Sequence, residues 1–134
     1  ARDVRKAEIG KRPDFLPEIE AIVHPLVAAD RAAFIAEATA DILVFDIPLL
    51  FETGGDAAMD ATVCVSIPDE EQAARVLARG TMTPEQFEAI RTKHMPNAEK
   101  CARADYVIVT DTLEHARAQV HSVISRIKEQ LTHA

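Results

Sequence analysis

Glycine and cysteine are scarce in this sequence, and tryptophan is absent. None of the four glycines falls in a GxxxxGK(S/T) or GxGxxG pattern, so neither common loop for cradling nucleotide phosphates is encoded. The two cysteines, Cys64 and Cys101, do not form a CxxC pair, which argues against a thiolate zinc site. So few cysteines indicate a reduced cytoplasmic protein rather than a disulfide-stapled one.

Excess basic charge and long apolar runs are also missing. Lys and Arg number 15 against 22 Asp and Glu, a net charge of −7, so we expect no nucleic-acid partner. No run approaches the roughly 18 apolar residues of a membrane span, so we expect no membrane association. The five histidines show neither HxH nor HExxH spacing, so no metal site is expected in the chain. A local phosphate site is still compatible with this composition, because a few arginines suffice.

The chain does contain an ordinary share of apolar residues, 48% of 134, which is enough for one globular domain with a core. Its first forty or so residues have helical spacing. We expect one helix over residues 1–11 and a second that starts near Phe15. The residue before a proline is pushed out of the α region, so His24–Pro25 should end the second helix, and a third is expected over residues 26–40.

Three short apolar runs are typical of strands buried on both faces: residues 42–45, 61–67 and 106–109. Helical patterns lie between the apolar runs at residues 61–67 and 106–109 and after the second of them. One of these helices has a clear start signal, because Thr83-Pro84-Glu85-Gln86 places suitable residues at the N-cap, N1 and N3 positions. Alternating strands and helices predict an α/β fold with a parallel sheet and helices on both faces. Three strands are fewer than the usual four to six or so, so we expect further sheet partners from outside this chain.

The most distinctive segment is DIPLLFE, residues 46–52, which follows the first expected strand. Open α/β sheets bind their ligands at this end of a strand. Leaving Leu49, Leu50 and Phe51 exposed would be costly unless they pack on something. They either fold back on the core or form the apolar wall of a ligand site, with Glu52 as its polar anchor. Asp46, after an apolar run, also resembles the aspartate of a Walker B strand, which helps to hold Mg²⁺.

A second candidate site lies on the helix expected over residues 69–79, where Gln72, Arg75 and Arg79 share one face. Planar guanidinium groups suit bidentate contacts with phosphate. A solvated helix face paired with neighbouring acidic residues explains the same spacing. A second capped helix follows at once, and such a helix pair could close over phosphates and exclude water.

Taken together, these segments resemble the dephospho-CoA kinase family over essentially all 134 residues. The resemblance rests on five stretches in the family's order and spacing: IEAIVHPLV (19–27), ILVFDIPLLFETG (42–54), VCVSIPDEEQAARVLAR (63–79), MTPEQFEAI (82–90) and AEKCARADYVI (98–108). It implies a three-layer α/β/α P-loop kinase-like fold in one domain, residues 1–134. Within it, a helical substrate-binding region would span about residues 1–40 and lid-like helices about residues 75–100.

The family's activity, as the resemblance implies it, is ATP-dependent phosphorylation of the ribose 3′-hydroxyl of dephospho-CoA, the last step of CoA biosynthesis. Its cofactors would be ATP and Mg²⁺. Three groups of residues carry over from the family motifs. The substrate group is His24, Pro25, Leu49, Leu50, Phe51 and Glu52. The group that approaches the ATP phosphates is Arg75 and Arg79, and the adenine-side group is Lys100 and Asp105.

The sequence departs from the family pattern at its start. The family's opening strand, P-loop and general-base aspartate precede the matched region and have no counterpart here. Phosphoryl transfer depends on those parts, so we expect a truncated kinase domain with no catalytic residue or metal ligand of its own, inactive by itself. Two alternatives stay open. The chain could belong to another small-molecule P-loop kinase, such as a nucleoside monophosphate kinase, or be a non-catalytic fragment that self-associates through an exposed sheet edge.

Overall fold

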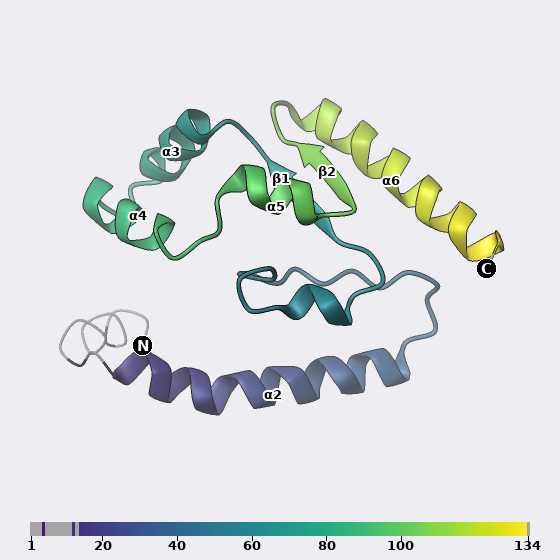
Figure 1. The fold of residues 1–134 in the computed structure, drawn as a ribbon, viewed down its shortest axis with the longest axis horizontal. Helices are drawn as coiled ribbons and strands as arrows, with labels where there is room; N and C mark the ends of the chain where they lie inside the picture. The colour runs from purple at the N-terminus through teal and green to yellow at the C-terminus, as the bar shows by residue number, and fades with distance from the viewer. Residues whose placement is uncertain (1–3, 5–11, 13, 134) are drawn as a thin grey trace. The chain divides into compact units, whose positions relative to one another are not determined.

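The computed structural model describes residue 4, residue 12 and residues 14–133. The chain forms two compact units, Ala1–Asp46 and Ile47–Ala134 (Figure 1). The helix expected over residues 1–11 lies outside the described residues, apart from Val4.

One helix, α2 (Phe15–Glu37), makes up most of the described part of the first unit. The expected break at His24–Pro25 is wrong, because Pro25 lies inside this continuous helix. A proline in a helix removes one backbone hydrogen bond and crowds the carbonyl four residues before it, at a cost of about 3 kcal/mol. Alanine is the strongest helix former, and alanines on both sides of the proline favour continuation: Ala21, Ala28, Ala29, Ala32 and Ala33.

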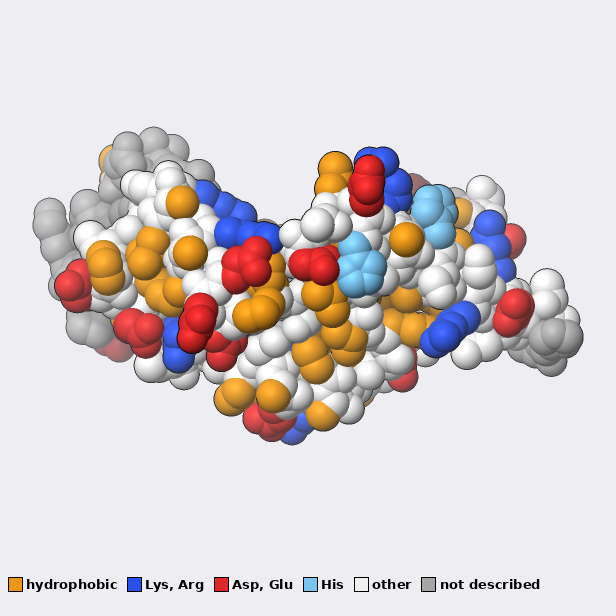
Figure 2. All heavy atoms as spheres, turned by 90° about the horizontal axis from the view of Figure 1, so that it is seen from above, with side chains coloured by type: hydrophobic (Ala, Val, Ile, Leu, Met, Phe, Trp, Pro, Cys, Tyr) orange, Lys and Arg blue, Asp and Glu red, His pale blue; other side chains and the backbone are white. Residues whose placement is uncertain are grey.

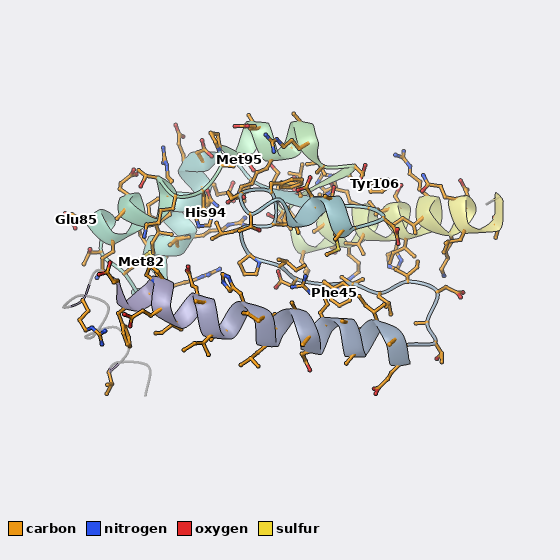
Figure 3. All side chains as sticks on the ribbon, turned by 60° about the horizontal axis from the view of Figure 1, so that its bottom comes forward. Phe45, Met82, Glu85, His94, Met95 and Tyr106 are labelled. Carbon is orange, nitrogen blue, oxygen red and sulfur yellow. The ribbon has the colours of Figure 1, made fainter. Side chains whose placement is uncertain are left out.

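Residues 42–45 follow α2 and do not form the expected strand. They have no partner strand among the described residues, and Val44 is 86% exposed. An apolar run without a neighbour cannot satisfy its backbone groups as a strand does. Phe45 packs on α2 instead (Figure 3). Its ring meets Phe34 edge to face with centroids 5.8 Å apart, and the Arg31 guanidinium lies 5.9 Å from its centroid.

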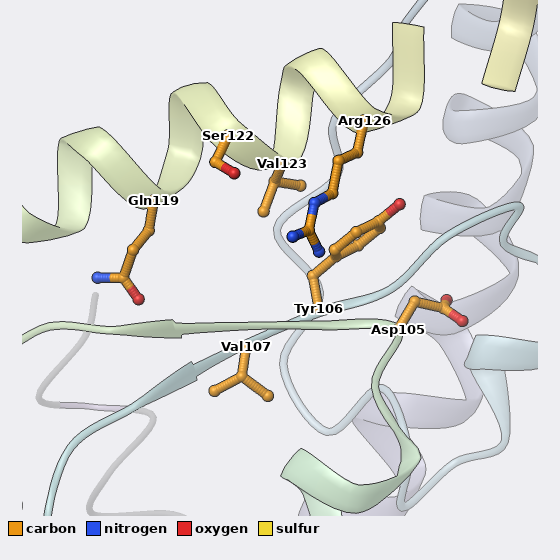
Figure 4. A pocket seen from close by; sticks show the side chains of 7 residues that line it. All are labelled: Asp105, Tyr106, Val107, Gln119, Ser122, Val123 and Arg126. Carbon is orange, nitrogen blue, oxygen red and sulfur yellow. The ribbon is translucent and has the colours of Figure 1, made fainter. Parts of the chain in front are cut away.

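The second unit is built on two parallel strands, β1 (Val63–Ser66) and β2 (Tyr106–Val109). The strands pair residue for residue, from Val63 opposite Tyr106 to Ser66 opposite Val109. Helix α5 (Asn97–Arg103) packs against β1, and α6 (Leu113–His133) packs against β2 on the opposite face (Figures 1 and 4). The expected α/β class, with a parallel sheet between helices, is confirmed.

Three further elements complete this unit: η1 (Gly55–Ala58), α3 (Asp69–Ala78) and α4 (Pro84–Arg91). The start of α4 has the expected capping box. The Thr83 hydroxyl accepts a hydrogen bond from the Gln86 N–H, and the Gln86 side chain accepts one from the Thr83 N–H. The paired helices α3 and α4 contact each other and lie between β1 and α5 in the sequence.

The buried core of the second unit is small: Phe51, Cys64, Phe87 and Ile108. Apolar side chains therefore reach the surface between charged ones, as Figure 2 shows for one face. Val65 at the middle of β1 is 64% exposed, so the expectation of burial on both faces is wrong for this strand. The reason is that side chains alternate along a strand: Cys64 faces α5, whereas Val65 lies on the other face of β1. No helix within that part is long and apolar enough to cross a membrane.

Candidate functional site

A tight turn over Leu49 to Gly55 includes the second half of the DIPLLFE segment, residues 46–52, that the sequence singles out. Leu49 has φ of 56°, in the left-handed region that a leucine rarely adopts. Three hydrogen bonds hold this conformation. The Thr53 N–H and hydroxyl both donate to the Leu49 carbonyl, at 3.1 and 2.8 Å, and the Gly55 N–H donates to the Leu50 carbonyl at 2.9 Å. Phe51 is buried, while Leu49 and Leu50 are half-buried.

Glu52 lies within this turn, close to the Lys100 ammonium and the His94 imidazole. Its Oε2 is 3.3 Å from Nζ of Lys100 on α5 and 3.7 Å from Nδ1 of His94, which Figure 3 labels between α4 and α5. The carboxylate is well covered, with 15% of the side chain exposed. Oε2 nevertheless makes no hydrogen bond of good geometry to any described residue. Oε2 itself is covered by protein atoms and faces the Lys100 ammonium.

The pKa of Glu52 lies below its ordinary value of 4.5. Burial raises the pKa, but the residue's own backbone N–H, the Lys100 ammonium and the Met95 backbone N–H together outweigh that effect. Glu52 is therefore ionised at neutral pH, where a carboxylate only accepts hydrogen bonds. The site combines an apolar turn with a fixed negative charge.

Arg75 reaches the edge of the sheet at which both strands end. Its Nη1 donates to the Thr110 carbonyl at 2.9 Å, just after β2, and it forms an ion pair with Glu71 one helical turn away. Thr110 in turn donates its N–H to the Ser66 carbonyl at the end of β1, at 2.9 Å. Open α/β sheets bind ligands at this edge. Arg75 thus lies at the carboxyl ends of both strands, where its guanidinium is already bonded to backbone carbonyls and to Glu71.

Arg79 differs from Arg75 in its surroundings. It is the C-cap residue of α3 and is exposed. Within the described chain, no carboxylate lies within ion-pair distance of its guanidinium. Gly80, with φ of 67°, follows and turns the chain toward α4. The guanidinium of Arg79 is therefore available to an anion.

Asp105 lies at the opposite edge, where both strands begin. Its Oδ2 accepts hydrogen bonds from the N–H and hydroxyl of Thr62, at 2.7 and 3.1 Å. The Thr62 hydroxyl accepts one from the Asp105 N–H at 3.1 Å. A shallow hollow of about 280 Å³ opens beside this edge, and Figure 4 shows Tyr106 and Arg126 facing each other in it. The hydrogen bonds of Asp105 join the starts of β1 and β2, which is a structural task.

The structure brings some predicted site residues together and leaves others apart. Glu52 and Lys100, which the sequence analysis assigns to different sites, form an ion pair. Arg75 and Asp105 lie at opposite edges of the sheet. His24 and Pro25 belong to α2 in the first unit, and His24 is exposed there.

His94 is the residue that sequence reasoning missed. It approaches Glu52 only because the chain between α4 and α5 passes beside the turn. No local sequence pattern predicts such a contact. Asn97 was also missed as a contact residue, because its position at a helix start predicts only a cap. Its side chain instead donates to the Ser66 hydroxyl at 2.9 Å.

No cluster of three or more His, Cys, Asp or Glu side chains within the described residues could hold a metal ion. Asp46, which resembles a Walker B aspartate in sequence, is exposed and has no second carboxylate grouped with it. We therefore assign no metal ligand among the residues that the structure describes.

Comparison with known proteins gives one consistent result. Residues 1–115 match the family model described as dephospho-CoA kinase. Dephospho-CoA kinase of Ruegeria pomeroyi is 68% identical over 134 residues, which are 100% of this chain and 68% of that protein. The corresponding protein of Cereibacter sphaeroides is 54% identical over 90% of this chain and 61% of its own length. That of Jannaschia sp. is 52% identical over 96% of this chain and 66% of its own length.

A solved structure has a similar fold. The crystal structure of TT1252 from Thermus thermophilus matches with a TM-score of 0.80 at 28% identity, over 93% of this chain and 65% of that one. This chain thus spans roughly two thirds of the length of these proteins. A family-model match over most of the chain, together with 68% identity to a curated relative, places the sequence without ambiguity. The chain belongs to the dephospho-CoA kinase family.

Proposed function

We propose that this chain supplies the dephospho-CoA-binding part and the lid-like helices of a kinase that transfers the γ-phosphoryl group of ATP to the ribose 3′-hydroxyl. The product is CoA, which completes its biosynthesis. The single observation that carries the assignment to this site is the ionised Glu52 carboxylate, held by Lys100 beside an apolar turn. Dephospho-CoA has matching chemistry, with alkyl groups next to amide N–H and hydroxyl donors.

The turn would act as the wall of the substrate site. Leu49 and Leu50 are half-buried and keep apolar surface outside the small core, where a ligand's alkyl groups could cover it. Glu52 would accept a hydrogen bond from the substrate through its carboxylate, since 15% of the side chain is exposed. Lys100 would keep that carboxylate ionised and fixed in place, which reduces the ordering that binding requires. Lys100 would then act as a positioning residue rather than as a contact on the adenine side.

Arg79 would be the phosphate-contacting residue of the lid-like helices. Its exposed guanidinium has no carboxylate partner in the described chain, and Gly80 with φ of 67° makes the turn that leads from α3 toward α4. Arg75 would hold α3 to the carboxyl edge of the sheet through Thr110. In phosphoryl transfer such arginines neutralise charge that develops in the transition state.

Calorimetric titration of this chain with dephospho-CoA tests the proposal. We expect saturable binding that weakens at least tenfold in Glu52→Gln, while Arg117→Ala on exposed α6 binds like the unmodified chain. The Ruegeria pomeroyi protein serves as the positive control for both binding and turnover. If a nucleoside monophosphate binds and competes while dephospho-CoA does not, the substrate assignment is wrong. A folded chain that binds neither ligand would overturn the substrate site at this turn.

A second candidate, self-association, is favoured by one feature of the sheet. β1 pairs only with β2 among the described residues, and Val65 on it is 64% exposed. An unpaired strand edge invites another chain to pair with it. Multi-angle light scattering over a range of concentrations measures this directly. A strict monomer at all concentrations would contradict self-association and leave the kinase proposal untouched.

A further inference from the structure

The two cysteines of the chain are neighbours in space. Their Sγ atoms lie 3.8 Å apart, and the Cys101 thiol points its S–H toward Cys64. Cys64 is buried in the middle of β1, and Cys101 is partly exposed on α5. The proposed substrate site uses neither thiol, although Cys101 directly follows Lys100.

Packing of α5 on β1 holds the thiols in this arrangement. Asn97, at the start of α5, donates from its side chain to the Ser66 hydroxyl at the end of β1, at 2.9 Å. One turn further along α5, the Cys101 thiol also lies 3.8 Å from the Asn97 Oδ1. A side-chain hydrogen bond thus fixes the helix to the strand next to the sulfur pair. The two sulfurs need to approach by less than 2 Å or so to reach bonding distance.

We propose that Cys64 and Cys101 form an oxidisable dithiol that closes to an intramolecular disulfide in the presence of hydrogen peroxide. In the first step the Cys101 sulfur attacks one peroxide oxygen, the O–O bond breaks, and Cys101 becomes a sulfenic acid with release of one water. In the second step the Cys64 sulfur, losing its proton, attacks the sulfenic sulfur. The S–S bond forms and a second water leaves. Two thiols lose two protons and two electrons, and one peroxide is reduced to two waters.

The order of the two steps follows from exposure. Peroxide in solution reaches the partly exposed Cys101 and not the buried Cys64. Burial and the neighbouring Cys101 thiol also raise the pKa of Cys64 to about 11, which keeps it a thiol and a poor first reactant. Once Cys101 is oxidised, its sulfur presents an electrophile next to Cys64, and proximity compensates for the low nucleophilicity.

The disulfide would close the segment that carries α3 and α4. Residues 64–101 include both helices and the two arginines Arg75 and Arg79. Cross-linking the ends of a segment of this length restricts the unfolded chain and stabilises the folded one. The bond would also tie Cys101, and with it the adjacent Lys100, more closely to β1.

The test treats the reduced chain with stoichiometric peroxide and measures its intact mass and its peptide map. We expect a loss of two hydrogens, one peptide joining Cys64 to Cys101, and a melting temperature raised by several degrees. In Cys64→Ala, Cys101 has no resolving partner and should be trapped by dimedone as a sulfenic acid. In Cys101→Ala, Cys64 should stay unmodified under the same dose.

Several outcomes would overturn the proposal. One is a disulfide between two chains in place of the internal one. Another is overoxidation of Cys101 in the unmodified chain without a linked peptide. A third is equal dimedone labelling of the unmodified and Cys64→Ala chains. Circular dichroism of each variant checks that it is folded, and the linked peptide in the unmodified chain tests the proposal even if a variant unfolds. None of these readouts involves dephospho-CoA or ATP, so they are independent of the kinase assignment.

Discussion

The Lys100 ammonium lies 3.3 Å from the Glu52 carboxylate, and this contact joins the DIPLLFE turn to helix α5. Both side chains are well covered, at 22% and 15% exposed. An ion pair of this kind cannot lose one partner without leaving a buried charge behind. The pair therefore links the shape of the candidate substrate site to the helix that ends the lid-like region.

The first prediction concerns this ion pair. Glu52→Gln should lower the free energy of unfolding by about 1–2 kcal/mol, because Lys100 then keeps its charge without a carboxylate partner. Lys100→Met should cost about as much. The double variant should cost less than the sum of the two, by about 1 kcal/mol. Urea unfolding followed by circular dichroism measures each term.

The matched control is the exposed pair of Glu99 and Arg103 on the same helix, with side chains 49% and 50% exposed. Glu99→Gln should cost no more than about 0.5 kcal/mol, because solvent screens an exposed pair. Additive effects of Glu52→Gln and Lys100→Met would show that the contact carries no coupling.

The second prediction is a pH dependence with a definite sign. The pKa of Glu52 is lower in the folded chain than its ordinary 4.5, so its contribution to stability is present above pH 4.5. That contribution should be lost as the pH falls below 4.5 and through the folded-state pKa. The drop in stability between pH 5.5 and 3 or so should be smaller in Glu52→Gln.

Asp111 provides the comparison for this titration. His115 hydrogen-bonds to the Asp111 carboxylate at 2.7 Å and lowers the pKa of Asp111 in the same direction. This pair is exposed, so Asp111→Asn should leave most of the acid sensitivity in place. If Glu52→Gln and the unmodified chain have parallel stability curves below pH 4.5, the ionised carboxylate is not what Lys100 stabilises.

The sequence predicted the elements that local patterns define. The strand at residues 106–109 and the capping box at Thr83 and Gln86 are confirmed, because an apolar run and a cap are set within a few residues. Residues 42–45 have the same kind of apolar run and form no strand, because a strand also needs a neighbour, which sequence reasoning about one segment cannot supply. At Pro25 the local signal predicts a helix end, but the helix-forming residues around it outweigh that preference and the helix continues.

The candidate site also has one part that the local sequence predicts and another that depends on tertiary contacts. The DIPLLFE segment stands out in the sequence because three large apolar residues follow an acidic one outside a regular element. The ion pair with Lys100 and the approach of His94 depend on the path of the chain after α4. The spacing of residues in the sequence does not predict that path. The family resemblance supplied Lys100 as a site residue but not the partner that the structure gives it.

The third prediction separates the two arginines of α3. Arg75→Ala should lower the free energy of unfolding by about 1 kcal/mol, since Arg75 donates to the Thr110 carbonyl at 2.9 Å. Arg79→Ala should change it by less than about 0.5 kcal/mol, because Arg79 is exposed. If the Ruegeria pomeroyi relative has an arginine at the position of Arg79, replacing it with alanine should reduce turnover by about a hundredfold or more. Unchanged turnover there would remove Arg79 from the phosphate site.

The fourth prediction concerns Asp105. Asp105→Ala should destabilise the fold by about 2 kcal/mol, because Thr62 loses a charged acceptor for both its N–H and its hydroxyl. Thr62→Val removes only the hydroxyl and should cost less. The adenine-side role remains a prediction, and the full-length relative tests it: under conditions where the variant is fully folded, a higher KM for ATP would support that role. An unchanged KM would leave Asp105 with its structural task alone.

The last prediction uses the backbone of the turn itself. Leu49 has φ of 56°, which costs a residue with a Cβ about 1 kcal/mol and costs glycine nothing. Leu49→Ala removes the side chain and keeps this strain, whereas Leu49→Gly removes both. Leu49→Gly should therefore be the more stable variant by up to about 1 kcal/mol, the reverse of the order in a helix or strand.

Gly54 supplies the control, since its φ is 74° and a Cβ added there would meet nothing within 4 Å. Gly54→Ala should lower the free energy of unfolding by about 1 kcal/mol through backbone strain alone.

Urea unfolding ranks the three variants, and calorimetry with dephospho-CoA separates a role in the substrate wall from a role in the turn. If Leu49 is part of the wall, both Leu49 variants should bind more weakly to a similar degree, although their stabilities differ. If binding instead follows stability, the leucine serves the turn and not the ligand.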